Sequence, residues 1–518
     1  MHLLQTPVHP RRRFQQQTPI SCLTDELLET IFQFHVTWTY SQRVKNAEEL
    51  LKLTHVCQWW RALALACPSL WRNIEVCRPH LAQEYLKRRG PSGPISFLSS
   101  PGQHLPKLQD FERLIRYANR MQHVDVAFGP ADMRLFLYRL GPQFNDVSSM
   151  RLIQVSADGP AEELHLARDL ASLRQLALDG VTVNWNSIFN LTALVLCRLR
   201  GPKAPSMSDL QLIFNNNPGL EEVSVHDVAV KPSDTTHLAE APHRLRLLRL
   251  SMPSSSTVSI ISGLFIPAST RIEIRTWGAT DQITSIFPVH NGRLHSFISI
   301  TKDSTLSIRS RKITIRHTES LPFSDHYVRL VIEVTQNISV AILPILPKVF
   351  DLSLLTTLEV DFMHPDLLRP DACRESLKIT RQFLASLFNL VTLRVCQALA
   401  DIVAPLLGES ASFPGVAVPR LTWLSFGDPS QMWWNFPTTA NGDPAGGWLQ
   451  PIAMGLRARR ALTFTKLGTL EFIGIGHIDR NSTNLLLPFV DNIFNSVLCP
   501  GNSPCPVCSR GPNLRAGW

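Results

Sequence analysis

The sequence predicts a mixed protein of the α+β or α/β class, in which a small N-terminal helical unit precedes an irregular solenoid of short parallel strands and helices. Two patterns predict this class. Residues 19–78 carry apolar side chains at helical spacing, and from residue 121 onward a short apolar pattern typical of single strands recurs. Of the 518 residues, 44% are hydrophobic and 18% charged, which is the composition of a globular protein rather than a disordered one.

The first predicted helix begins near residue 24. Thr24 can cap its start, and Asp25 and Glu26 place negative charge at the positive end of the helix dipole. The apolar face of this helix is expected to consist of Leu27, Leu28, Ile31 and Phe32. A second helix start is predicted at Asn46, because two glutamates follow in its first turn.

A long helix is predicted around residue 57, because one apolar stripe falls at i, i+3, i+4, i+7 and i+11. Its members are Leu53, Val56, Cys57, Trp60 and Ala64. Pro68 ends this helix, and Leu70 and Trp71 follow directly. Two or three helices of this size cannot bury so much apolar surface among themselves. At roughly 25 cal/mol per Å2, that surface must be covered by a partner or by another part of the chain.

The same stretch resembles the F-box, in the form found in large families of fungal proteins. The matching segments are Ile20–Phe32, Val56–Arg61 and Ala66–Trp71, in the order and at the spacing of that family. Leu23 is followed by Thr24 where the family usually has proline, and residues 36–47 exceed the minimal motif. The close resemblance covers about the first 80 residues.

The resemblance implies that these helices dock on the Skp-type linker protein of a cullin-RING ubiquitin ligase. Some of the matching residues must instead hold the helical unit together, and the sequence does not separate the two sets. The residues expected to bind the partner are Leu23, Leu27, Leu28, Ile31, Phe32, Leu53, Val56, Trp60, Leu70 and Trp71. Without the resemblance, the same side chains fit the core of a helical cap on the solenoid equally well.

The repeated unit of the remaining chain is apolar-x-x-apolar-x-apolar, a short strand whose alternate side chains point inward. Its copies are Met121/Val124/Val126, Met150/Ile153/Val155, Leu173/Leu176/Leu178, Leu191/Leu194/Leu196, Leu220/Val223/Val225, Leu245/Leu248/Leu250, Leu355/Leu358/Val360, Leu390/Leu393/Val395, Leu421/Leu424/Phe426 and Leu467/Leu470/Phe472. From Leu220 to Leu245 is 25 residues, within the roughly 20–29 typical of leucine-rich repeats. The architecture resembles that of F-box proteins with leucine-rich repeats.

Residues 271–335 differ, because four segments there alternate strictly and little helix separates them. These segments are 271–275, 297–300, 312–316 and 330–334. Either the repeats have lost their helices here or a separate hairpin is inserted, and we favour the first account. Further helices are predicted at Leu108–Met121, before the repeats, and at Asn484–Val497, where Leu485, Leu486, Phe489, Ile493 and Val497 form the stripe of a closing helix.

These patterns divide the chain into five predicted segments. They are a disordered tail at 1–18, the F-box-like unit at 19–78, a linker and N-terminal cap at 79–120, an irregular leucine-rich-repeat-like domain at 121–497, and a tail rich in Cys, Pro and Gly at 498–518.

The sequence offers little support for catalysis. It contains no nucleophile elbow, phosphate-binding loop or His-Glu-x-x-His motif. Cys505 and Cys508 have zinc-ligand spacing and Cys499 could add a third ligand, but a closed site needs four. We therefore expect a non-enzymatic protein without a metal or cofactor. The loop 427–448 is rich in tryptophan, and its aromatic side chains either pack on the repeats or anchor a partner.

The charge and the cysteine usage of the sequence limit the cellular compartment and the classes of partner that we expect. The net charge is +9, but the basic clusters are far apart and lack the interleaved aromatics of a nucleic-acid platform. The sequence has neither a secretory signal nor an apolar run of membrane-spanning length. Scattered cysteines within apolar patterns favour a reducing compartment, the cytoplasm or nucleus. We expect no nucleic acid or membrane as partner.

Together these observations favour a substrate-recognition adaptor of an SCF-type (Skp-cullin-F-box) ubiquitin ligase. The helices would dock on the Skp-type linker, and through it on a cullin, while the repeat domain would bind a protein substrate that the sequence does not identify. The alternative is a leucine-rich interaction scaffold that is not attached to a ligase. An enzyme with an unrecognised site is a third, less favoured hypothesis.

Overall fold

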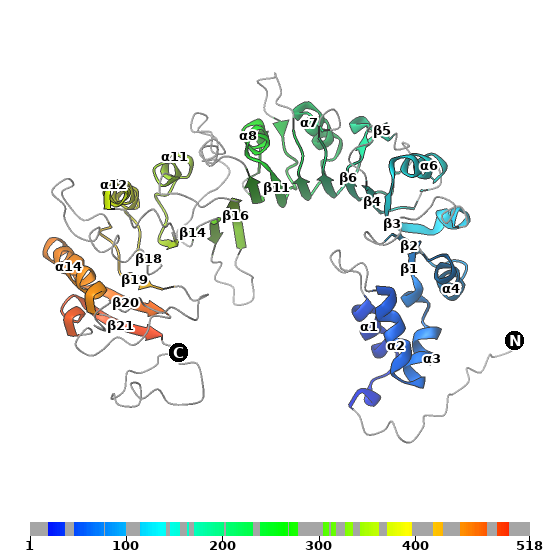
Figure 1. Cartoon of the computed structure of the whole chain (residues 1–518), viewed down its shortest axis with the longest axis horizontal. Coiled ribbons are helices and arrows are strands. Elements are labelled where there is room, and N and C mark those ends of the chain that lie inside the picture. Colours follow the sequence, from blue (N-terminus) through cyan, green and yellow to red (C-terminus); the bar gives the residue numbers. More distant parts are fainter. Residues whose placement is uncertain are drawn as a thin grey trace. The chain divides into compact units, whose positions relative to one another are not determined.

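The structure is a computed structural model, and Figure 1 shows its helices and strands. The residues that it describes are 19–36, 46–76, 78–99, 114–140, 144, 146–155, 163–164, 170–200, 204–230, 239–267, 269–277, 304–309, 312–317, 327–334, 342–361, 370–395, 418–427, 446–473 and 484–496. The predicted tails, the strand at 297–300, most of the loop 427–448 and the three C-terminal cysteines lie outside these residues. Chain contacts define two compact units, so the predicted repeat domain divides near residue 205.

Unit 1 comprises residues 1–204 and 215–220, and begins with the helical elements that the sequence predicts. These are η2 (Pro19–Cys22), α1 (Asp25–Val36), α2 (Asn46–Val56), α3 (Gln58–Ala66) and η4 (Pro68–Trp71). The cap of α1 is confirmed, since the amide of Leu27 donates a hydrogen bond to Thr24 Oγ1 (3.4 Å). The start of α2 at Asn46 is also confirmed.

The predicted long helix is wrong, because Cys57 divides it into α2 and α3. Cys57 is extended (φ −157°, ψ 171°), and its Sγ accepts a hydrogen bond from the amide of Trp60. It is therefore the N-cap of α3 rather than a member of a continuous stripe. Leu53 and Ala64 are buried, but Val56 at the end of α2 is exposed.

A parallel sheet follows, in which each strand pairs with the next strand along the chain. Its strands are β1 (Asn73–Glu75), β2 (Ile95–Leu98), β3 (Met121–Phe128), β4 (Ser149–Gln154), β6 (Gln175–Asp179) and β8 (Ala193–Cys197). Connecting elements are α4 (Pro79–Arg89), η5 (Ile115–Arg120), α6 (Pro130–Leu140) and η7 (Trp185–Ser187), with a small parallel pair of β5 (Glu163–Leu164) and β7 (Thr182–Val183).

The register of this sheet explains its core. Val124, Met150, Leu176 and Leu194 lie opposite one another on successive strands, and all are buried. Neighbouring strands thus cover the alternate apolar side chains of each repeat, as in a stack whose core lies between adjacent units.

Three further sequence predictions in unit 1 need correction. In β4, Met150 is confirmed as inward and is joined by Leu152, Ile153 is buried at the end of the strand, and Val155, which was predicted to face inward, is 44% exposed. The sheet also begins before residue 121, so residues 79–120 contribute α4, β2 and η5 instead of a linker. Of the predicted helix at 108–121, the described part is a turn and the 3-10 helix η5, and Met121 starts β3.

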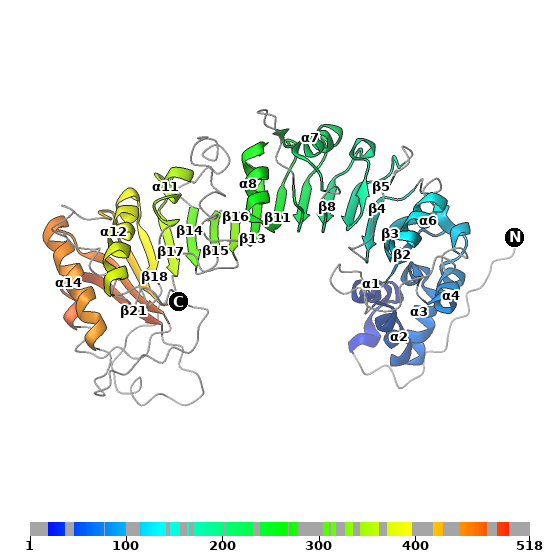
Figure 2. The ribbon, with the colours of Figure 1, turned by 45° about the horizontal axis from the view of Figure 1, so that its top comes forward.

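Unit 2 comprises residues 205–214 and 221–518. Its strands are β9 (Glu222–His226), β11 (Leu247–Pro253), β13 (Arg271–Trp277), β14 (Ser304–Arg309), β15 (Lys312–His317), β16 (Tyr327–Val334), β17 (Thr357–Asp361), β18 (Thr392–Val395), β19 (Trp423–Phe426), β20 (Leu467–Ile473) and β21 (Val490–Ser496), with a short pair of β10 (Ala239–Glu240) and β12 (Leu264–Phe265). Its helices include α7 (Met207–Asn216), α8 (Ser254–Gly263), α11 (Leu346–Val349), α12 (Pro370–Ser386) and α14 (Gly446–Thr463). Figure 2 shows α12 and α14 on one side of strands β17 to β21.

The apolar pattern of the repeats is confirmed in unit 2, where every described copy that the sequence predicts is buried. Strands β17 to β21 pair in parallel and in chain order, as do β9, β11 and β13. Both units are therefore mixed α/β structures built on mostly parallel strands.

The middle segment contradicts the account that we favoured from sequence. Strand β13 pairs in parallel with β16 rather than with β14, and β15 is antiparallel to both of its neighbours. Strand β14 then pairs in parallel with β17, so the spatial order is β13-β16-β15-β14-β17. A three-stranded meander is thus built into the sheet, as the inserted-hairpin alternative requires. The meander satisfies the backbone groups of both flanking strands.

The predicted closing helix at 484–497 is also wrong. Only residues 484–486 are helical, and β21 pairs in parallel with β20, with Leu470 opposite Ile493. Leu486 and Val490 are buried, while Leu485 is exposed. A strand is favoured here because β20 would otherwise present an unpaired edge.

The turns that leave the strands share one conformation. The residue directly after β6, β8, β9 and β19 has a positive φ, with values of 70°, 51°, 51° and 122° at Gly180, Arg198, Asp227 and Gly427. At Gly427 a side chain is excluded, because a Cβ would lie 1.9 Å from the carbonyl oxygen of Ile473. This left-handed residue turns the chain out of the strand.

No helix among the described residues is long and apolar enough to cross a membrane.

Arg459 on α14 supports the chain before β19. Its side chain is almost fully buried, and its two terminal nitrogens donate hydrogen bonds to the carbonyl oxygens of Val418, Pro419 and Leu421 (2.7, 3.0 and 2.9 Å). Burial lowers the pKa of the Arg459 guanidinium. The side chain thus joins α14 to the start of a repeat through three backbone carbonyls, of which that of Val418 also accepts a hydrogen bond from the amide of Leu421 (3.3 Å).

We expect Arg459→Met to destabilise the chain by about 1–3 kcal/mol, because the buried carbonyl of Leu421 loses its described donor and the carbonyls of Val418 and Pro419 each lose one hydrogen bond. Arg459→Lys should lie between wild type and Arg459→Met, since one ammonium cannot reach all three carbonyls. Urea unfolding monitored by circular dichroism measures both values. A loss below about 1 kcal/mol for Arg459→Met would contradict this role.

Glu333 on β16 carries a second testable interaction. Its carboxylate accepts a hydrogen bond from Lys312 Nζ on β15 (2.8 Å) and lies 2.8 Å from Arg275 Nε on β13. The hydrogen bond from Lys312, with the charges of both cations, holds the pKa of Glu333 below its ordinary value of 4.5. The group thus fixes the meander strand between its two neighbours.

Because the pKa is lower in the folded chain, the contribution of Glu333 is present above pH 4.5 and is lost as the pH falls through the lowered pKa. Glu333→Gln should therefore reduce the free energy of unfolding above pH 4.5, by about 1 kcal/mol or less, and the difference from wild type should vanish in acid. Glu221→Gln, whose carboxylate lies 3.8 Å from an exposed Arg246, is the matched control. Denaturant unfolding across pH tests this, and a difference that grows as pH falls would refute it.

Candidate partner-docking face and sheet groove

Helix α1 has two apolar faces with different surroundings. Leu28 and Phe32 are fully buried, and the ring of Phe32 lies 4.8 Å from the ring of Trp60. Leu27, Ile31 and Phe34 fall at i, i+4 and i+7, so they form one stripe, and they are 52%, 44% and 77% exposed. This helix therefore presents an uncovered apolar stripe beside the one that forms the core.

Neighbouring elements add further exposed apolar side chains. Helix α2 lies beside α1 (Figure 1) and exposes Leu51 and Val56 while it buries Leu50 and Leu53. Ile20 on η2 is also exposed. We call the set Ile20, Leu27, Ile31, Phe34, Leu51 and Val56 the docking face.

The structure separates the ten residues that the sequence predicts as partner-binding. Leu27, Ile31 and Val56 belong to the docking face, and Leu23 and Trp60 are partly exposed. The buried remainder, which a partner cannot reach without unfolding the unit, is Leu28, Phe32, Leu53, Leu70 and Trp71. Sequence reasoning missed Ile20, Phe34 and Leu51, although the i+7 spacing of Phe34 from Leu27 could have identified it.

Polar contacts hold the helices in this arrangement. The indole nitrogen of Trp59 donates to Asp25 Oδ1 (3.2 Å), which joins α3 to the first turn of α1. Arg61 Nε donates to the carbonyl oxygen of Thr54 (2.7 Å) across the break at Cys57. At the other end of α1, Gln33 Nε2 donates to Ser69 Oγ (2.7 Å).

Trp71 joins the helical elements to the sheet. Its indole nitrogen donates to the carbonyl oxygen of Ala64 (2.9 Å), and its ring meets Tyr85 of α4 edge to face, with centroids 4.8 Å apart. The guanidinium of Arg88 lies 4.9 Å from the same ring. Burial of the Tyr85 hydroxyl, with Glu75 nearby, raises its pKa to about 12. Trp71 is therefore a structural link rather than a surface for a partner.

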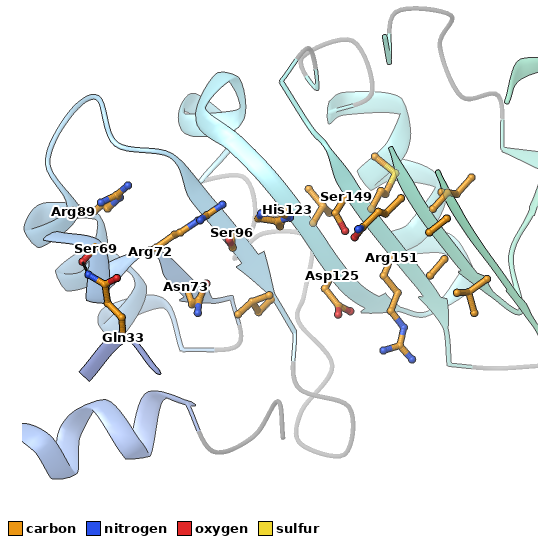
Figure 3. Close-up of a pocket in the computed structure, with 18 of the residues that line it drawn as sticks. Gln33, Ser69, Arg72, Asn73, Arg89, Ser96, His123, Asp125, Ser149 and Arg151 are labelled. Carbon is orange, nitrogen blue, oxygen red and sulfur yellow. Dashed lines mark hydrogen bonds between the residues drawn. The ribbon is translucent and has the colours of Figure 1, made fainter. Parts of the chain in front are cut away.

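Unit 1 also contains a groove of about 650 Å3 over the sheet face that points away from the core. Its lining begins at Gln33 of α1 and Ser69 of η4 and extends across the strands to β8. Strand register places one row of side chains along it, namely Asn73, Ser96, His123, Ser149, Gln175 and Ala193. Figure 3 shows Arg89, Arg72, His123 and Ser149 near one another at this level of the groove.

The end of the groove nearest the helical elements is basic. Arg72 and Arg89 both line it, and His123 follows on β3. Burial and the neighbouring charge of Arg89 lower the pKa of Arg72, and burial with the charge of Arg72 lowers the pKa of His123. Sequence reasoning missed this groove, because its residues come from six strands and no local pattern connects them.

Other candidate sites remain unsupported. Within the described part of the chain, no group of three or more His, Cys, Asp or Glu side chains could hold a metal ion. The cysteines at 499, 505 and 508 lie outside it, as does most of the tryptophan-rich loop. The absence of catalytic activity thus stays a prediction.

Comparison with known proteins gives no family assignment. Neither the protein-family models nor the curated proteins contain a match to this chain. Among solved structures, the crystal structure of the Rad7 and Elc1 complex in yeast matches with 10% sequence identity and a TM-score of 0.25, covering 90% of this chain and 92% of that chain. This TM-score is too low to indicate a common fold.

The two faces of α1 predict opposite outcomes for the same substitution. Leu28→Asp should unfold the helical unit, at a cost of about 3–5 kcal/mol, because an unpaired carboxylate would replace a fully buried side chain. Leu27→Asp should change the free energy of unfolding by less than about 0.5 kcal/mol, because the side chain is already half exposed. Limited proteolysis and denaturant unfolding of both variants compare these outcomes. Equal effects would show that the stripe is covered in solution.

Proposed function

We propose that this chain is a substrate-recognition adaptor of an SCF-type ubiquitin ligase, with the docking face binding a Skp-type linker protein and through it a cullin. The observation that carries the proposal is the uncovered stripe of Leu27, Ile31 and Phe34 in the segment that resembles the F-box. A folded unit that keeps large apolar side chains exposed beside a complete core is typical of a binding surface. The resemblance identifies the linker as its partner.

The apolar surface that the stripe exposes is large enough to contribute substantially to the binding of a partner. Covering a large apolar side chain contributes about 1.5–3 kcal/mol, and these side chains retain about half of that potential or more. The exposed Leu51 and Val56 on α2 could extend the contact. Association costs offset much of this sum, so the stripe would act as a small group of dominant contacts within a larger interface.

The mechanism of an adaptor is proximity. Bringing a substrate to the ligase raises the local concentration of substrate lysines near the ubiquitin-bearing enzyme, and the adaptor itself makes and breaks no bonds. In this chain the docking face and the groove belong to the same compact unit, and Trp71 joins their elements. A substrate in the groove would thus be held at a defined position relative to the linker.

The proposal places the chain in a reducing compartment, the cytoplasm or the nucleus. Two cysteines of the helical unit act as thiols in the structure: Cys57 Sγ caps α3, and Cys67 Sγ shares a hydrogen bond with Ser69 Oγ (3.0 Å). Oxidation would remove both interactions, so the structure favours conditions that keep them reduced.

Affinity purification of the full chain from cells, with proteasome activity blocked, tests the proposal. The double variant Leu27→Asp, Ile31→Asp should lose about tenfold or more of the recovered Skp-type linker and cullin, because two charges would enter an apolar contact. The matched control is Leu135→Asp, Tyr138→Asp, which changes two exposed apolar residues of α6 in the same unit. Its recovery should equal that of the wild type.

Two outcomes would contradict the proposal. Undiminished recovery of the linker by the docking variant would show that the stripe is not the contact. Failure of the wild-type chain to recover any cullin component would favour the leucine-rich interaction scaffold without ligase attachment.

A further inference from the structure

The groove of unit 1 is long enough to hold a short extended peptide. Its row of register-matched side chains runs from Asn73 on β1 to Ala193 on β8, across five strand-to-strand steps. At about 4.8 Å a step the row is about 24 Å long, which about seven extended residues would span. Ser149 and Gln175 in this row are accessible and carry groups that can bond a peptide backbone.

The basic end of the groove differs from those parts of the sheet where arginines are ion-paired. On the corresponding face of unit 2, Arg249 pairs with Glu273 (2.9 Å), and Arg394 pairs with Glu359 (2.9 Å). In unit 1, no carboxylate among the described residues forms an ion pair with Arg72 or Arg89. These two guanidinium groups therefore present positive charge that the described structure does not neutralise.

The bonds that these arginines do make hold them in place without cancelling their charge. Arg72 Nη2 donates to Gln122 Oε1 (2.8 Å), and Arg89 Nε donates to the carbonyl oxygen of Pro94 (2.9 Å). Arg72 Nε is buried without a hydrogen-bond partner. Both acceptors are neutral, so the positive charge of each guanidinium is kept. Each guanidinium has five N–H donors and uses one in these bonds, and the others can form charge-assisted hydrogen bonds to an oxyanion.

The rest of the lining selects a peptide over a nucleic acid. His123 is the one aromatic ring in the described lining, whereas single-stranded nucleic acids are held on several stacked aromatic side chains. Farther from the arginines the lining includes Asp125, Arg151 and Gln175, and then the small apolar residues Ala177, Ala193 and Val195. Such positions accept apolar side chains of modest size.

We propose that the groove binds an extended acidic peptide segment, whose carboxylate side chains lie against Arg72 and Arg89 and whose following apolar side chains lie over Ala177, Ala193 and Val195. That this segment belongs to a ligase substrate rests on the proposed function above, while the binding itself does not. The segment is thus defined by its chemistry, with acidic residues first in the groove and apolar residues beyond them.

The test uses the purified full chain and a pool of fluorescent peptides of about ten residues, the length that fills the groove with a margin. Each peptide carries two adjacent glutamates followed by positions randomised over Ala, Val and Leu. A matched pool replaces the glutamates with glutamines. The acidic pool should bind at least about tenfold more tightly in fluorescence anisotropy, and its affinity should fall as salt rises. Equal binding of the two pools would overturn the proposal.

Two substitutions locate the binding within the groove without removing an arginine. Ser149→Asp places a carboxylate directly opposite His123 in the strand register. Ser149→Asn introduces a side chain of almost the same size and shape as aspartate, but without its charge. The acidic pool should bind Ser149→Asp about tenfold more weakly and Ser149→Asn within about threefold of wild type. Equal effects of the two substitutions would mean that charge in the groove does not matter, and would overturn the proposal.

Removing a groove charge gives an independent comparison. Arg89→Gln should weaken binding of the acidic pool by about tenfold, while Arg246→Gln, which removes an exposed charge in unit 2, should leave it unchanged. A pool with phosphoserine in place of the glutamates distinguishes the sources of the anion. Binding of the phosphorylated pool alone, or displacement of the acidic pool by an RNA of equal charge at equal concentration, would overturn the assignment.

The docking variant separates this inference from the proposed function. Leu27→Asp, Ile31→Asp should bind the acidic pool as wild type does, because neither residue lines the groove. Loss of the linker with retained peptide binding would refute the ligase role alone. Recovery of the linker without peptide binding would refute the groove alone.

Discussion

The structure of unit 1 depends on the burial of Trp71. This side chain ends the helical elements, bonds back to α3 through Ala64, and packs on Tyr85 of α4. Strand β1 begins two residues later, so the sheet starts where this contact fixes the chain. A stack of parallel strands buries its core only between neighbours, and therefore its first strand needs a cover. Here the cover is the helical unit, and the same contact fixes the docking face relative to the groove.

The helical unit also shows why burial and exposure must be assigned residue by residue. Adjacent positions such as Leu27 and Leu28 are equally apolar, yet one is half exposed and the other fully buried. Helical periodicity separates them by about 100°, which is enough to place them on different stripes. The core stripe is closed by Phe32 against Trp60, and it needs nothing from the second stripe. The exposed stripe thus contributes little to the stability of the unit.

The sequence predicted the strands well and their order less well. The unit apolar-x-x-apolar-x-apolar encodes both a strand and its inward face, so Leu173 or Leu421 could be placed without knowledge of neighbours. At β4 the predicted set of inward residues was out of step with the strand. Ile153 and Val155 fit the apolar pattern as well as Leu152 does, and only the pairing of Leu152 with Val126 on β3 shows which residue continues the core row. The meander and β21 depend on which distant strand supplies the partner edge, which local periodicity does not contain.

Local chemistry also limited how much of the candidate sites could be predicted from the sequence. The break at Cys57 depends on a thiol that caps α3, and cysteine is not among the common caps from which helix starts are predicted. The sequence identified the segment that carries the exposed apolar stripe, but it could not tell which leucines form the core. The groove could not be predicted at all, since its side chains meet only after six strands have paired in register.

The charge pattern of the two units links these observations to function. In unit 2, Arg249 on β11 pairs with Glu273 on the neighbouring β13, and Arg271 on β13 itself pairs with the same carboxylate. In unit 1, Arg72, Arg89 and Arg120 bond instead to neutral oxygens of Gln122, Pro94 and Gly93. Neutral acceptors satisfy the hydrogen-bonding geometry of a guanidinium but leave its field intact. The repulsion among these arginines opposes folding, and an anionic ligand would relieve it. Under the proposed peptide binding, a bound acidic group would therefore stabilise this end of the sheet of unit 1.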